Sequence, residues 1–201
     1  MQTPTQTSDA AQWAQAIGTC IAALVALFTV IFIEILKPWR KRPILKIEFE
    51  DKYPYCKYSD TDDFEGMGML TGYWVRLRIR NIGRSPALNC IGRMLEIRDG
   101  RGMWLQQYDP ETLDWRGIIS GPITLAPDDF EYLDIWLTAK GISDMRLRVR
   151  DRTPRGGVFD FRPGNYVIKI IIISDNAKPV SQTYRVDWNG TYDQIRMQAM
   201  T

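Results

Sequence analysis

The chain of 201 residues contains no histidine and only three cysteines, Cys20, Cys56 and Cys90. The lack of histidine excludes histidine acid–base catalysis, histidine metal ligands, and Ser-His or Cys-His nucleophile pairs. The cysteines are too few and too widely spaced for a disulfide framework or a cysteine-rich zinc site. The formal net charge of +2 indicates no nucleic-acid polymer as a partner. We therefore expect a protein that is not an enzyme and needs no cofactor.

Charged residues are also missing between Ala16 and Ile33, and this gap predicts a membrane-spanning helix. A helix over the apolar run Ala14–Leu36 would be about 34 Å long, enough to cross a hydrocarbon core of about 30 Å. A cleaved signal peptide is the alternative. It fits poorly, because the segment before the run has no Lys or Arg and the run is too long for a signal peptide.

Aromatic and basic residues flank the apolar run and predict where it meets the two membrane surfaces. Indole rings favour the interface, whereas Lys and Arg beside a span stay cytoplasmic and can also contact anionic lipid headgroups. The flanking residues are Trp13, Lys37, Trp39, Arg40, Lys41 and Arg42. Because no Lys or Arg precedes Lys37, we expect a single-pass protein in the lipid bilayer, with its N-terminus outside.

Four parts follow from this topology: an extracytoplasmic tail, a transmembrane helix, a basic juxtamembrane linker and a cytoplasmic domain. Their ranges are 1–12, 13–37, 38–43 and 44–201. Within the helix, the small residues Gly18, Ala22 and Ala26 repeat every four positions and share one face. Such a face allows close contact between helices, so we expect a homo-oligomer or a protein partner.

The C-terminal domain reads as β-structure, because apolar and polar residues alternate within short segments that are separated by turn signals. The predicted strands are Ile44–Glu50, Tyr73–Arg80, Ala87–Arg98, Phe130–Leu137, Met145–Arg150, Tyr166–Ile173 and Gln182–Trp188. The nearly continuous β-branched run at Tyr166–Ile173 is typical of a central buried strand. This pattern predicts a mainly β fold, an antiparallel β-sandwich, with a small β-barrel as the alternative.

Four local features complete the prediction for this domain. Asp51–Thr71 and Arg101–Gly121 are expected to be long loops, and Gly92 is expected to mark a β-bulge. Tyr192–Met200 is expected to form a short helix. The acidic residues of the first loop do not have the spacing of a calcium-binding loop, so no metal site is predicted.

The segment Arg80–Ala87 predicts a sharp crossover between strands. Asn81 and Gly83 tolerate left-handed conformations, and Pro86 ends strand pairing. This segment and Asp187–Tyr192 resemble immunoglobulin-like β-sandwich domains of poorly characterised bacterial single-pass membrane proteins. The resemblance implies an N-terminal membrane helix, a basic joint, a C-terminal sandwich and a location in the bacterial inner membrane. The layout is also similar to that of membrane effectors of bacterial antiviral systems.

Arginine recurs at alternate positions of two predicted strands, and 18 of the 26 basic residues are Arg. The residues of these two stripes are Trp74, Arg76, Arg78, Arg80, Arg146, Arg148 and Arg150. If the strands were neighbours, the guanidinium groups would form one face able to bind an anion, with Trp74 stacking on a base. The alternative is a solvated face neutralised by acids on adjacent strands, such as Asp134 or Glu131.

These observations lead first to a membrane-anchored, non-enzymatic β-sandwich that acts as a binding or interaction module. A second hypothesis follows from the arginine stripes and from the likeness to antiviral effectors. In that case the cytoplasmic domain senses a cyclic nucleotide or another anion, and oligomerised helices disrupt the membrane. The third hypothesis is a structural subunit of a larger membrane complex.

Overall fold

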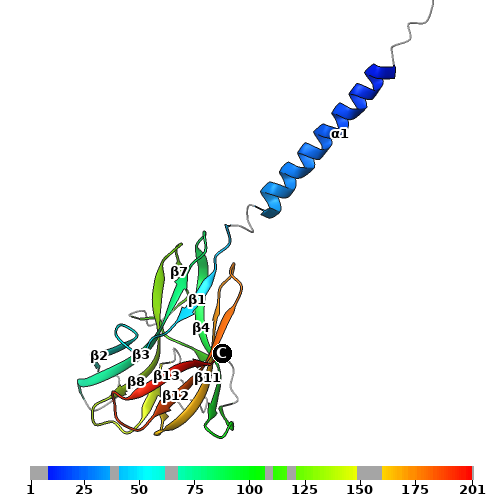
Figure 1. Ribbon diagram of the computed structural model, residues 1–201. Coiled ribbons are helices and arrows are strands. Elements are labelled where there is room, and N and C mark those ends of the chain that lie inside the picture. The colour runs from blue at the N-terminus through cyan, green and yellow to red at the C-terminus, as the bar shows by residue number, and fades with distance from the viewer. Residues whose placement is uncertain are drawn as a thin grey trace, which may run out of the picture. The chain divides into compact units, whose positions relative to one another are not determined.

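The computed structural model describes residues 9–36, 41–61, 68–106, 111–116, 121–148 and 160–200. The chain divides into two units, Met1–Arg42 and Pro43–Thr201. The first is helical and the second consists of β-sheets (Figure 1).

The helical unit consists of α1 (Asp9–Ile31) and a π-helical turn over Phe32–Leu36. Its apolar stretch Gln12–Glu34 has a mean hydropathy of 2.6, and none of it is buried. Leu24 and Phe28 are each 65% exposed in mid-helix. By length and composition, this helix could be a membrane anchor or a signal sequence.

The β unit contains two antiparallel sheets. Sheet I consists of β1 (Leu45–Glu48), β2 (Cys56–Thr61), β3 (Leu70–Asn81), β8 (Phe130–Ala139), β9 (Met145–Leu147) and β10 (Asp160–Phe161). Its order is β1-β3-β8-β9-β10, with β2 also pairing with β3. Sheet II consists of β4 (Ala87–Asp99), β5 (Trp104–Gln106), β6 (Glu111–Thr112), β7 (Ile123–Leu125), β11 (Gly164–Ile173), β12 (Val180–Trp188) and β13 (Ile195–Met200). Its order is β13-β12-β11-β4-β5, with β6 and β7 also pairing with β4.

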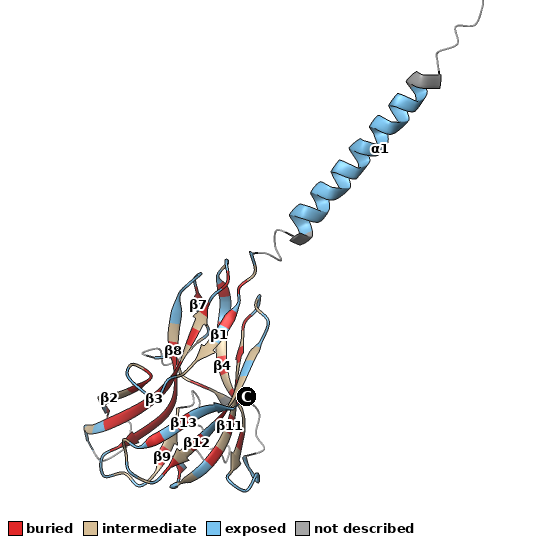
Figure 2. Cartoon of the chain, viewed as in Figure 1, coloured by how far each residue is buried: buried red, intermediate tan, exposed pale blue. Residues whose placement is uncertain are grey.

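The hydrophobic core lies between the two sheets, because alternate residues of each strand point inward. On β3 the inward residues are Val75, Leu77 and Ile79, and on β11 they are Ile168, Ile170 and Ile172. Each of these side chains is fully buried, and Figure 2 shows the buried segments that recur along the strands. Two separate antiparallel sheets around one core confirm the predicted mainly β fold and match a sandwich rather than a closed barrel.

The structure corrects the predicted boundaries in several places. The tail predicted as a helix contains the strand β13, because Ile195 and Met197 alternate with exposed Arg196 and enter the core. The two predicted loops contain β2, β5 and β6, which are short strands at sheet edges. Residues 149 and 150 of the predicted strand Met145–Arg150 lie outside the described part of the chain.

Gly92 does not mark the bulge. The register shift between β11 and β4 pairs Lys169 with Glu96 and Ile170 with Met94, so the extra residue is Leu95. Gly92 instead faces the core, where an added Cβ would lie 2.5 Å from a methyl carbon of Leu133 on β8. Glycine at this position therefore allows the two sheets to approach each other closely.

Candidate functional site

The two arginine stripes lie on the outer face of sheet I, but their strands are not neighbours. On β3, inward Val75 and Leu77 alternate with Trp74, Arg76 and Arg78, so the first stripe points away from the core. Strand β8 lies between β3 and β9, the strand that carries the second stripe. Acidic side chains of β8 can therefore insert between the stripes.

Asp134 of β8 occupies this intermediate position. Its Oδ1 accepts a hydrogen bond of 2.6 Å from Nε of Arg76, and both side chains are 7% exposed. Burial raises the pKa of the Asp134 carboxyl, and the charge and hydrogen bond of Arg76 offset this only in part. Asp134 is thus one of the acids that the sequence suggested as a neutralising partner. The other, Glu131, accepts a hydrogen bond from the backbone N–H of Tyr132.

The stripes converge on Trp74. The guanidinium carbons of Arg76 and Arg148 each lie 5.2 Å from the centre of the Trp74 ring, within the range of cation–π attraction. Arg148 also forms an ion pair of 3.7 Å with Asp114. Asp114 directly precedes Trp115, which forms an isolated antiparallel bridge with Leu133 of β8. The described residues at this point form a network of two arginines, two aspartates and one indole ring, in which Arg76, Asp134 and Trp74 are buried and Arg148 and Asp114 are half-buried.

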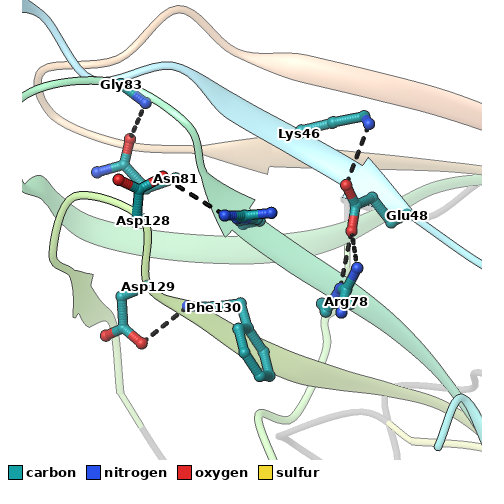
Figure 3. Close-up of polar contacts among 9 residues, drawn as sticks. Lys46, Glu48, Arg78, Asn81, Gly83, Asp128, Asp129 and Phe130 are labelled. Atoms are coloured by element: carbon teal, nitrogen blue, oxygen red, sulfur yellow. Dashed lines mark hydrogen bonds and ion pairs between the residues drawn. The ribbon is translucent and has the colours of Figure 1, made fainter.

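A second ion pair joins β3 to β1 (Figure 3). Arg78 donates to Glu48 with an Nε–Oε2 distance of 2.7 Å, and Nζ of Lys46 lies 3.1 Å from Oε1 of the same carboxylate. Burial would raise the pKa of Glu48, but the hydrogen bonds and charges of Arg78 and Lys46 together hold the pKa below its ordinary value. The Arg78 guanidinium also lies 5.3 Å from the ring centre of Phe130.

Lys46, Glu48 and Arg78 line a hollow of about 360 Å³. Lys46, Glu48, Arg78 and Tyr55 contribute from sheet I and its adjoining loop, and Gln182 and Tyr184 contribute from β12. Glu48 forms ion pairs with both Lys46 and Arg78, so among the described residues this hollow presents no unpaired cation to a ligand.

The remaining arginines of the stripes are paired as well. Arg80 lies 3.4 Å from Asp128, and Arg146 donates to Asp160 across 2.9 Å. Arg150 lies outside the described residues. Every described arginine of the two stripes therefore contacts a carboxylate, and the outer face of sheet I is held together by its own ion pairs.

The Asn81 motif organises one end of the β unit, and it does so differently from the prediction. Neither Asn81 nor Gly83 has a left-handed φ. Instead the fully buried Asn81 side chain accepts hydrogen bonds from the N–H groups of Ile44 and Gly83 and donates to the carbonyls of Ser85 and Leu125. Figure 3 shows the hydrogen bond from the N–H of Gly83 to the Asn81 side chain. The motif thus fixes Ile44, the residue before β1, against the segments that contain Ser85 and Leu125.

In the helical unit, two threonines satisfy their hydroxyl groups within the helix. The hydroxyl groups of Thr19 and Thr29 donate to the carbonyls of Gln15 and Val25, four residues earlier. Trp13 is 69% exposed. Gly18, Ala22 and Ala26 are exposed and share one helix face.

Of the other predicted interface residues, Lys41 and Arg42 lie in the described part of the chain. Lys37, Trp39 and Arg40 lie outside it, as do Asp62, Asp63 and Glu65 of the acidic loop. No group of three or more Cys, Asp or Glu side chains in the described ranges is arranged to hold a metal ion. Burial raises the pKa of the Cys56 thiol to about 11, so this cysteine remains protonated at neutral pH.

The fold and this site define a class: an N-terminal apolar helix followed by a two-sheet β unit whose first sheet carries paired charges on its outer face. The resemblance drawn from Arg80–Ala87 agrees with the structure at this level of architecture. Comparisons with protein-family models, curated proteins and solved structures gave no match, and no family is identified.

Proposed function

We propose that the protein is a membrane-anchored, non-enzymatic interaction module. In this proposal α1 spans the bacterial inner membrane once, and the β unit in the cytoplasm binds another protein. The observation that carries the proposal is the contrast between the two units. The large apolar side chains of α1 are exposed, whereas the β unit buries a continuous core of its own. An exposed apolar helix of this length is stable in a bilayer.

The paired arginines favour an interaction module over a nucleotide-gated effector. A phosphate-binding face needs guanidinium groups whose donors are available to the ligand. Arg76, Arg78 and Arg80 each contact a carboxylate, and Arg76 is almost completely buried. An anion would have to displace these carboxylates before it could bind.

Membrane anchoring is tested on the full chain with a C-terminal tag. We expect the uncleaved protein of 23.3 kDa in membranes that have been washed with alkaline carbonate, and protection of the tag from protease added outside the cell. Leu24→Arg places a charge in the middle of the span, which costs about 3 kcal/mol of insertion free energy, and should reduce the membrane fraction. Leu24→Ala is the matched control. A cleaved, soluble product would overturn the proposal.

Partner binding is tested by crosslinking in intact cells. We expect a defined protein crosslinked through the β unit, and no change of membrane potential when cyclic nucleotides are supplied. Depolarisation by a cyclic nucleotide would contradict the proposal and support the effector hypothesis. Crosslinks confined to α1 would instead indicate a structural subunit held by helix contacts.

A further inference from the structure

The outer face of sheet II carries a second group of cations that the sequence analysis did not single out. Inward residues of β4, β11, β12 and β13 enter the core, so the intervening residues point to solvent. We define the basic face as Arg93, Arg98, Lys169, Arg185 and Arg196. All five are half-buried or exposed.

Acidic residues on this face are too few to neutralise it. Among the described residues the strands contribute Glu96 and Asp187 to the same side. Glu96 is shared, because Arg98 lies 3.0 Å and Lys169 lies 3.9 Å from its carboxylate oxygens. Asp187 pairs with Arg185 at 3.3 Å, and both side chains are more than 40% exposed. Arg93 and Arg196 form no ion pair with the described residues.

Strand register sets the spacing of these cations. Val167 of β11 pairs with Arg98 on one side and with Arg185 on the other, so these two arginines flank it in one row. Neighbouring strands are about 4.8 Å apart, and residues on the same side of a strand repeat every ~6.6 Å. Arg98 and Arg185 are therefore two strand spacings, about 9.6 Å, apart. An extended peptide rises ~3.3 Å per residue, so acids that lie two to four residues apart along it can reach both arginines.

Two features beside the basic face favour a peptide over a simple ion. Trp104 of β5 stacks on Arg98, with the guanidinium carbon 4.3 Å from the ring centre, and is still 47% exposed. It offers an apolar surface together with the half-buried Val167. At another part of the same face lies a hollow of about 350 Å³, lined by Asn165, Asp187, Trp188, Asn189, Gln194 and Arg196.

We propose that the basic face binds an extended acidic segment of a partner protein. The arginines supply two-point hydrogen bonds to its carboxylates, and Trp104 contacts its apolar side chains. The hollow beside Arg196 supplies amide and guanidinium donors for one further carboxylate. This inference rests on the proposed interaction function and names the surface and the chemistry of the partner.

The test measures binding of a fluorescent peptide that alternates Glu and Thr to the full chain in nanodiscs of neutral lipid. A peptide that alternates Gln and Thr is the control ligand. We expect the acidic peptide to bind at physiological salt, and Arg185→Glu/Arg196→Glu to weaken binding about tenfold or more. Arg84→Glu/Lys140→Glu makes the same change of charge at exposed positions off this face and should alter binding by less than about twofold.

Several outcomes would overturn the inference. These are no binding at physiological salt, equal losses in both double variants, or tighter binding to single-stranded DNA or to anionic vesicles than to the acidic peptide. Equal melting temperatures of the variants check that both fold. If the partner found by crosslinking in cells is retained by Arg185→Glu/Arg196→Glu, the basic face is the wrong surface, while the interaction function stands. Loss of membrane retention in the unaltered chain would contradict the proposed function instead.

Discussion

Both outer faces of the sandwich are rich in arginine, but the two faces differ in how the charge is compensated. On sheet I each described arginine of the stripes contacts a carboxylate, and Arg76 and Asp134 are buried together. On sheet II the described strands contribute five cations and two acids to the outer face, and the acids are partly exposed. A buried, paired charge contributes to the stability of a particular arrangement, whereas an exposed excess of charge is available to a partner. This difference is consistent with a structural role for the outer face of sheet I, and it is the reason we propose the outer face of sheet II for partner binding.

The largest expected effect is on sheet I, where Asp134→Ala leaves the Arg76 guanidinium buried without its carboxylate. We expect a loss of about 3–5 kcal/mol in the free energy of unfolding. The measurement is urea unfolding of the full chain in neutral detergent, followed by the fluorescence of the buried Trp136 and Trp188.

A double variant separates the cost of an unpaired charge from the worth of the pair. Because burial raises the pKa of Asp134 even beside Arg76, the pair itself adds little net stability. Arg76→Met/Asp134→Leu should therefore recover most of the stability that Asp134→Ala loses. If Asp134→Ala lowers the free energy of unfolding by less than about 1 kcal/mol, the charges of sheet I do not stabilise the fold, and the contrast drawn between the two faces is wrong.

The sequence predicted the architecture wherever the apolar pattern was dense. Tyr166–Ile173 forms a central strand whose residues Ile168, Ile170 and Ile172 enter the core, whereas the alternate residues are half-buried on the outer face. Strand β2 was missed because the segment Cys56–Thr61 is mostly polar and lies at a sheet edge, where only its terminal residues are buried. The edge strand β13 was mistaken for a helix for a similar reason, since only Ile195 and Met197 of its residues are buried.

The outward direction of the arginines on β3 could also be predicted, because the period of a strand is two residues. Of their partners, Asp134 was suggested by the sequence. Glu48 and Asp114 were not, because they lie on other segments and pairing depends on the register between strands. The register between β3 and β8 shifts after Val75, so that Arg76 is opposite Asp134. A slip of one residue would turn the carboxylate toward the core. The basic face was not predicted from the sequence, because its cations are spread over four strands and form no local motif.

A smaller effect is expected at Glu48, which lies at the side of sheet I and is 16% exposed. Because the pKa of Glu48 in the folded chain is below its ordinary value of 4.5, the carboxylate stabilises the fold above that pH. This stability is lost as the pH falls through the folded pKa. Glu48→Gln should lower the free energy of unfolding by about 1 kcal/mol at neutral pH, and by progressively less below about pH 4.5.

Urea unfolding at a series of pH values checks this prediction by comparing the unaltered chain with Glu48→Gln. The two curves should approach each other on the acid side. A constant difference at all pH values would mean that the ion pairs with Arg78 and Lys46 contribute nothing, and that the variant acts through packing alone.

The smallest effect on stability is expected from removing an acid of sheet II. Asp187→Asn breaks the exposed pair with Arg185 and should change the free energy of unfolding by less than about 0.5 kcal/mol. The same change raises the excess of positive charge on the basic face, so the alternating Glu-Thr peptide should bind severalfold more tightly at low salt and less markedly so at physiological salt. Removal of an acid thus has opposite consequences on the two faces, a loss of stability at Asp134 and a gain of affinity at Asp187. Unchanged or weaker peptide binding by Asp187→Asn would show that this carboxylate is part of the binding surface rather than a competitor for its cations.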